Sequence, residues 1–189
     1  MRAWLTAASD ALVSVIFPAG SRIGNELLTD SRGVPICREC LNSFERVPAI
    51  TCEICGLLLS GLAPKEKQPR LCPACEDKTY AFDCARSFAI YRGPLVQTIL
   101  MLKLEQIEPL GVWFAERPAE VVQRDGDKLT ADVAVPVPLH RQRERQRGYN
   151  LAALISKPLA KRLRLPHKAV LLIRTRARPD KRILSLEER

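Results

Sequence analysis

The chain has 189 residues, of which 47% are hydrophobic, and a formal net charge of +9. This length suits one ordinary domain, or a small module followed by a domain, and no apolar run is long enough to span a membrane. Most of the excess charge lies between Arg141 and Arg182, where fourteen Lys and Arg residues face two acidic residues. Such a density favours polyanionic partners, either nucleic acid or phosphorylated metabolites, although a surface of solvated Lys and Arg side chains would explain part of it.

The first 17 residues have the apolar spacing of an amphipathic helix, which Pro18 ends. Asp10 interrupts the apolar run that a signal peptide would need, so a targeting segment is the weaker alternative. We therefore interpret residues 1–35 as an N-terminal helix followed by an irregular segment. The remaining sequence divides into a cysteine-rich module over 36–84 and a further domain over 85–189.

Six of the seven cysteines occur as three Cys-x-x-Cys pairs. Cysteines so close in sequence are poor staples for a fold but good metal chelates, which favours a cytoplasmic protein over a secreted one. Sixteen residues separate the inner cysteines of two pairs, a spacing typical of a zinc ribbon. The predicted ligands of a closed, structural zinc site are Cys52, Cys55, Cys72 and Cys75.

The remaining pair, Cys37 and Cys40, has no second pair to complete a four-thiolate site. It is a remnant, an alternative to one of the zinc knuckles, or a weaker metal site, and the sequence leaves these readings open. Cys84 is single, and we interpret it as a small buried hydrophobe.

From residue 85 onward, apolar runs typical of strands alternate with helical patterns. The expected elements are a strand over 87–91, helices from Pro94 and over about 109–123, a strand over 131–137, a helix from about residue 150 and a strand over 169–173. This order predicts an α/β fold with a parallel sheet. A loop with four arginines follows the strand 131–137, and ligands of such sheets bind beyond the carboxyl ends of the strands. The loop is therefore a candidate anion site, with a solvated basic loop as the alternative.

Several motifs together resemble the ComF family of competence-associated proteins. They are the Phe-Pro after the first helix, the cysteine knuckles, Tyr91 with Gly93–Leu95, Leu102–Lys103, Pro136–Leu139 and Arg147–Asn150. The resemblance implies a zinc ribbon followed by a type I phosphoribosyltransferase-like domain linked to DNA uptake. It implies binding of phosphoribosyl pyrophosphate, with Mg²⁺ in a complete protein, and displacement of pyrophosphate at the anomeric carbon.

By this resemblance, Arg141, Arg143 and Arg147 would contact phosphate, since guanidinium groups pair well with phosphate oxygens. Lys103 is a weaker candidate, because a solvated lysine at a helix end is an equally good interpretation. The sequence ends before the loop that holds phosphoribosyl pyrophosphate in the family. We therefore expect an incomplete, catalytically inactive transferase-like domain.

Two further expectations come from the resemblance. The family often has another Cys-x-x-Cys after the Phe-Pro motif, and this chain has Ser21 and Gly24 there, which would leave Cys37 and Cys40 unpartnered. The alternative function is a non-catalytic zinc-ribbon adaptor that binds single-stranded DNA or a helicase partner during transformation.

Overall fold

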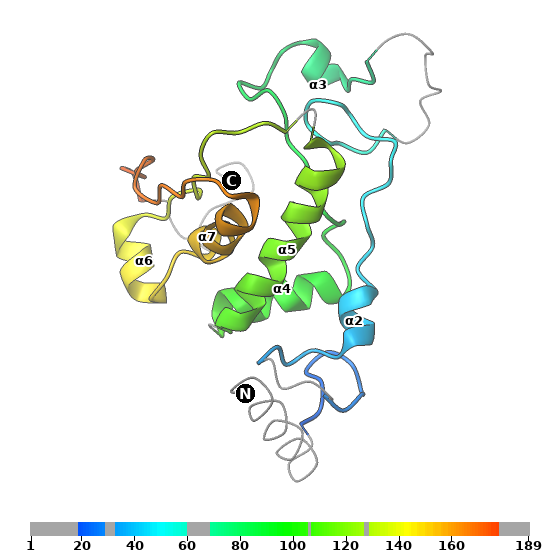
Figure 1. Ribbon diagram of the computed structural model, residues 1–189, viewed down its shortest axis with the longest axis vertical. Helices are drawn as coiled ribbons and strands as arrows, with labels where there is room; N and C mark the ends of the chain where they lie inside the picture. The colour runs from blue at the N-terminus through cyan, green and yellow to red at the C-terminus, as the bar shows by residue number, and fades with distance from the viewer. Residues whose placement is uncertain (1–18, 29–32, 60–68, 106, 127–128, 178–189) are drawn as a thin grey trace, which may run out of the picture.

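The computed structural model describes residues 19–28, 33–59, 69–105, 107–126 and 129–177. The helix expected over residues 1–17 lies outside these ranges. Within them the chain forms six helices (Figure 1): α2 (Arg38–Asn42), α3 (Pro73–Glu76), α4 (Pro94–Leu104), α5 (Glu108–Arg124), α6 (Arg141–Arg147) and α7 (Leu151–Leu163). None of these helices is long and apolar enough to cross a bilayer.

Helix α5 is the central element, and α4 and α7 pack against it (Figure 1). The core between them is built from Leu95 and Leu102 of α4 together with Leu110 and Phe114 of α5. Leu151, Leu154 and Ile155 add the apolar face of α7. The predicted helices from Pro94 and over 109–123 are confirmed. Their apolar residues recur at the helical period, so these residues share one buried face.

Proline is the first residue of two of these helices and lies inside two others. Pro94 is the first residue of α4, a position where its missing N–H group costs nothing. Pro118 lies inside α5 and Pro158 inside α7, yet each helix continues through its proline. The sequence suggested that Pro158 would bend or divide its helix, and division does not occur. Residues that pack into the core lie on both sides of each proline, Ala115 and Ala119 in α5 and Ile155 and Ala160 in α7.

The predicted parallel sheet is wrong. The described residues contain no strand, and only four isolated bridges occur among them. The expected strand over 131–137 makes a single parallel bridge, from Ala134 to His167. Its two hydrogen bonds join Ala134 N to Pro166 O at 2.9 Å and Lys168 N to Ala134 O at 3.0 Å.

Prolines explain why this pairing stops after one bridge. Pro136, Pro138 and Pro166 have no N–H group to donate, so a longer ladder cannot form around Ala134. The apolar run at 169–173 forms a turn and bends and remains solvent-exposed. The segment 87–91 pairs only through an antiparallel bridge between Arg46 and Ala89.

The arginine-rich segment forms helix α6, where the sequence predicted a loop. Arg, Gln and Glu are all good helix formers, and this composition outweighs the mutual repulsion of the charges. The helix ends at Gly148, which has a φ of +87° and donates its amide to Glu144 O at 2.7 Å. Asn150 then caps α7, because its side-chain oxygen accepts the amide of Ala152 at 3.0 Å.

Candidate metal centre and arginine helix

Four cysteines from two separate turns converge at one point. The sulfurs of Cys52, Cys55, Cys72 and Cys75 all lie within 4.8 Å of one another, and Cys55 Sγ is 3.6 Å from Cys72 Sγ. The predicted four-cysteine set is therefore brought together and could hold a metal ion. Three of these residues are buried, so an ion at this point would be shielded from solvent.

The local sequence shapes each of the two turns. Gly56 follows the first pair with a φ of +73°, and a Cβ atom there would lie 2.9 Å from the carbonyl oxygen of Ala85. Glycine is therefore required both for the turn and for the close approach of the next segment. In the second turn, Cys72 precedes α3 and Pro73 is its first residue.

Backbone amide groups and burial give the thiols of this cluster different pKa values. Burial raises the pKa of Cys52, but the N–H groups of Cys55, Cys72 and Ile54 outweigh burial and lower that pKa to about 6. Burial raises the pKa of Cys75 to about 12 and also raises the pKa of Cys55. Cys52 thus forms a thiolate readily, while a cation would have to displace the protons of Cys55 and Cys75.

An ion pair that sequence reasoning did not predict connects the metal centre to α5. Arg86 donates through Nη2 to Glu53 O at 2.9 Å and lies 3.3 Å from the carboxylate of Asp125, the residue after α5. The side chains of Arg86 and Asp125 are only 12% and 20% exposed, so solvent screens this pair weakly. Cys84 lies nearby, half-buried, and is not one of the four clustered cysteines.

Residues 19–28 repeat the backbone pattern of the first metal-binding turn. In both turns the first residue donates its amide to the carbonyl five positions later, from Ser21 to Glu26 and from Cys52 to Leu57, each at 2.8 Å. An isolated antiparallel bridge then closes each turn. The two segments therefore have the same local fold.

The side chains repeat the pattern too. Ser21 Oγ accepts the amides of Gly24 at 3.1 Å and Cys37 at 3.0 Å. Cys52 Sγ accepts the amides of Cys55 and Cys72 in the same way, the latter at 3.4 Å. This register aligns Ser21 with Cys52, Gly24 with Cys55, Cys37 with Cys72 and Cys40 with Cys75. The repeat cannot be recognised from the cysteine positions alone, because the first turn has Ser21 and Gly24 where the second has its metal-ligating cysteines.

Cys37 and Cys40 therefore belong to a second, cysteine-poor copy of the metal-binding arrangement. Among the described residues, no third metal-ligating side chain joins them closely enough to form a site. The amide of Cys40 and the hydroxyl of Ser21 lower the pKa of Cys37, whereas burial raises the pKa of Cys40 to about 11.

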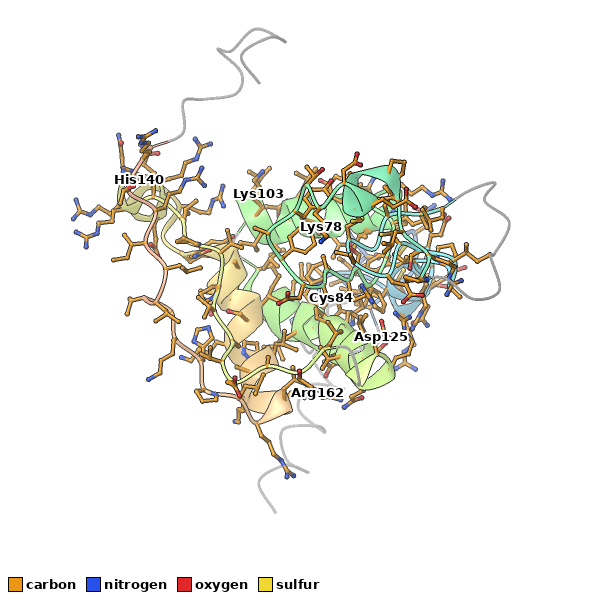
Figure 2. The ribbon with its side chains drawn as sticks, turned by 90° about the horizontal axis from the view of Figure 1, so that it is seen from above. Lys78, Cys84, Lys103, Asp125, His140 and Arg162 are labelled. Carbon is orange, nitrogen blue, oxygen red and sulfur yellow. The ribbon has the colours of Figure 1, made fainter. Side chains whose placement is uncertain are left out.

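The residues predicted to bind phosphate lie away from the cysteines, on and near α6. Arg141, Arg143 and Arg145 are exposed and Arg147 is half-buried. In Figure 2 the side chains around His140, at the start of α6, extend in several directions, and Lys103 lies on the same side of the molecule. The hydroxyl of Tyr149 donates to Leu102 O and so ties the turn after α6 to the end of α4.

The spacing of the arginines divides them between two faces of α6. Successive helical residues are rotated by about 100°, so Arg141 and Arg145 share one face while Arg143 and Arg147 share the opposite face. The three arginines predicted to bind phosphate therefore do not all face one point. An open groove of about 550 Å³ borders the segment just before α6, and the residues that line it include Val137, Ile173, Arg174 and Arg176.

Comparison of this chain with protein-family models, with curated proteins and with solved structures gives no match.

Proposed function

We propose that this chain is a ComF-type, non-catalytic adaptor that binds single-stranded DNA through α6. The observation that supports this function is the distribution of arginines around an exposed helix. A compact sugar phosphate is held by groups that converge on it, whereas an extended polyanion can follow charges spread over two faces. The groove bordered by Arg174 and Arg176 offers a continuation for the same strand.

Zinc is the ion we propose for the four-cysteine centre. Four thiolates match its tetrahedral preference and leave no open coordination position, so its role would be structural. Cys52, Cys55, Cys72 and Cys75 would hold it. Metal analysis of the purified chain tests this: we expect one zinc per chain, and its loss when Cys72 is replaced by serine.

Salt-dependent binding of an unstructured oligonucleotide tests the DNA proposal. Each phosphate contact to a single strand contributes a slope of about 0.7 to the plot of log K against log salt concentration. Arg141→Ala with Arg145→Ala should lower the slope by about 1.4, and Arg143→Ala alone by about 0.7. Lys157→Ala, an exposed residue of α7, is the charge-matched control and should change little.

A second candidate ligand is a phosphorylated sugar such as phosphoribosyl pyrophosphate. It is favoured by the contact between Tyr149 and Leu102, which brings the end of α4, with Lys103, close to the turn after α6. This ligand predicts saturable binding that depends on Lys103 and on Arg147, whose charge lies close to the Tyr149 hydroxyl. Binding of neither ligand to the wild-type chain would refute both functions.

A further inference from the structure

The cysteine-poor copy leaves two thiols on either side of one small empty volume. A Cβ atom built on Gly24 would lie 2.9 Å from Cys37 Sγ and 2.9 Å from Cys40 Sγ. Both sulfurs therefore border the same position, and only glycine leaves that position free. In the metal-binding copy the equivalent position carries the side chain of Cys55.

The polar groups around this pair do not complete a metal site. The Ser21 hydroxyl oxygen accepts the amides of Cys37, Gly24 and Ile23 at 3.0, 3.1 and 3.4 Å, so its lone pairs are already engaged. A tetrahedral thiolate site needs four ligands, and this copy supplies two. The described part of the chain contains one cluster suited to a metal, and it is the other copy.

A cavity borders one of these two cysteines. Cys37 is only 4% exposed, but it lines a cavity of about 700 Å³ whose wall also includes Glu26, Ile36 and Trp113. Cys40 is half-buried. Two neighbouring thiols with access to solvent and without a metal ion are able to react with oxidants, whereas thiolates bound to a metal are held in coordination.

We propose that Cys37 and Cys40 form a reversible disulfide, an oxidation site separate from the metal centre that takes hydrogen peroxide as its oxidant. The Cys37 thiolate attacks one peroxide oxygen; an S–O bond forms, the O–O bond breaks and one water leaves. The Cys40 thiolate then attacks the Cys37 sulfur; the S–S bond forms, the S–O bond breaks and a second water leaves. The two sulfurs lose two electrons, the peroxide gains them, and both thiol protons end in water.

The reverse step needs a thiol reductant. A small dithiol would attack one sulfur of the disulfide, form a mixed disulfide and release the second protein thiol, after which its own second thiol completes the exchange. Because Gly24 has no side chain, no Cβ atom occupies the position that both sulfurs border, and this residue does not obstruct their approach.

Trypsin separates the two cysteines, so peptide mapping tests the proposal directly. Cleavage after Arg32, Arg38 and Arg46 places Cys37 in peptide 33–38 and Cys40 in peptide 39–46. The zinc-loaded wild-type chain would be treated with hydrogen peroxide, alkylated and digested. We expect the two alkylated peptides to be replaced by one cross-linked pair that is lighter by two hydrogens than the two reduced peptides together. A dithiol reductant added before alkylation should restore them.

A double variant supplies the matched comparison. Ser21→Cys with Gly24→Cys gives the first copy four thiols at the positions that hold the metal in the second copy. This variant should bind a second zinc per chain and resist formation of the cross-link. If the variant does not fold, the wild-type peptide mapping still tests the proposal by itself. Recovery of both wild-type peptides fully alkylated after peroxide would overturn the proposal, as would two zinc ions per wild-type chain.

Discussion

Gly111 determines how closely α7 can lie against α5. A Cβ atom at this position would lie 2.6 Å from Leu154 Cγ and 3.2 Å from Leu154 O, and the carbonyl oxygen cannot move without moving α7. Gly111→Ala should therefore lower the free energy of unfolding by about 1–3 kcal/mol, although alanine is the better helix former. Urea denaturation measures this difference.

Gly126→Ala is the control for that substitution, because no described atom beyond the adjacent residues lies within 4 Å of a Cβ built there. Its effect should stay within about 0.5 kcal/mol. Equal losses at both glycines would mean that contact with Leu154 is not what excludes a side chain at 111.

Asp125 gives the molecule a predictable response to acid. Arg124 and, more weakly, Arg86 hold the pKa of Asp125 below its usual value of 3.8. A carboxyl group whose pKa is lower in the folded state adds stability above that value, and this stability is lost as the pH falls through the folded pKa. Asp125→Asn should therefore lower the melting temperature at pH 7, by an amount equivalent to about 1 kcal/mol, and the difference should shrink below pH 4.

Asp132→Asn is the matched control, since Asp132 is exposed. Thermal melts from pH 7 to pH 3 would compare the two variants with the wild type. A deficit in the Asp125 variant that persists unchanged at pH 3 would contradict the assigned role of the carboxylate.

At the scale of the elements, the segments around the metal centre have little core of their own. Their buried cluster consists of Leu59 and three of the clustered cysteines. A cluster of this size cannot hold a folded segment, so the bound ion would supply most of its stability. Chelation of the ion should thus increase amide exchange in 51–59 and 69–76 and leave α5 and α7 protected, which hydrogen exchange with mass spectrometry can resolve.

Two cysteine variants make that prediction specific. Cys72→Ser should reproduce the effect of the chelator, whereas Cys84→Ser should retain the metal, because Cys84 lies outside the four-sulfur cluster. Equal loss of protection along the whole chain on chelation would show that the metal stabilises more than its own segments.

The elements also divide into those that the sequence could predict and those that it could not. The four clustered cysteines and the helices from Pro94 and Glu108 follow from spacing within a short stretch, so local sequence was sufficient. The strand at 131–137 required pairing with distant residues, which local sequence does not reveal. Prolines on both sides of the bridge restrict that pairing to Ala134. Ser21 and Gly24 were noted only through a resemblance, because neither is a typical metal ligand.

For the whole molecule, the failed sheet prediction has a physical consequence at 169–173. The run was expected to be a buried strand, and instead Val170, Leu171, Leu172 and Ile173 are 82%, 61%, 55% and 65% exposed. A run of this kind, rich in β-formers and without charge or proline, is typical of segments that drive self-association. Lys168, Arg174 and Arg176 flank it, and their repulsion between copies opposes that association.

This balance predicts that the chain self-associates more strongly as the salt concentration is raised. Salt should have the opposite effect on DNA binding, which it weakens. Salt screens the repulsion between flanking charges but leaves the apolar attraction intact. Val170→Glu with Leu172→Glu should abolish the salt-induced rise in sedimentation coefficient. Leu104→Glu with Val112→Glu adds the same charge at two other exposed apolar residues and should leave the rise in place. If both double variants remain monomeric at high salt, net charge and not the apolar run controls association.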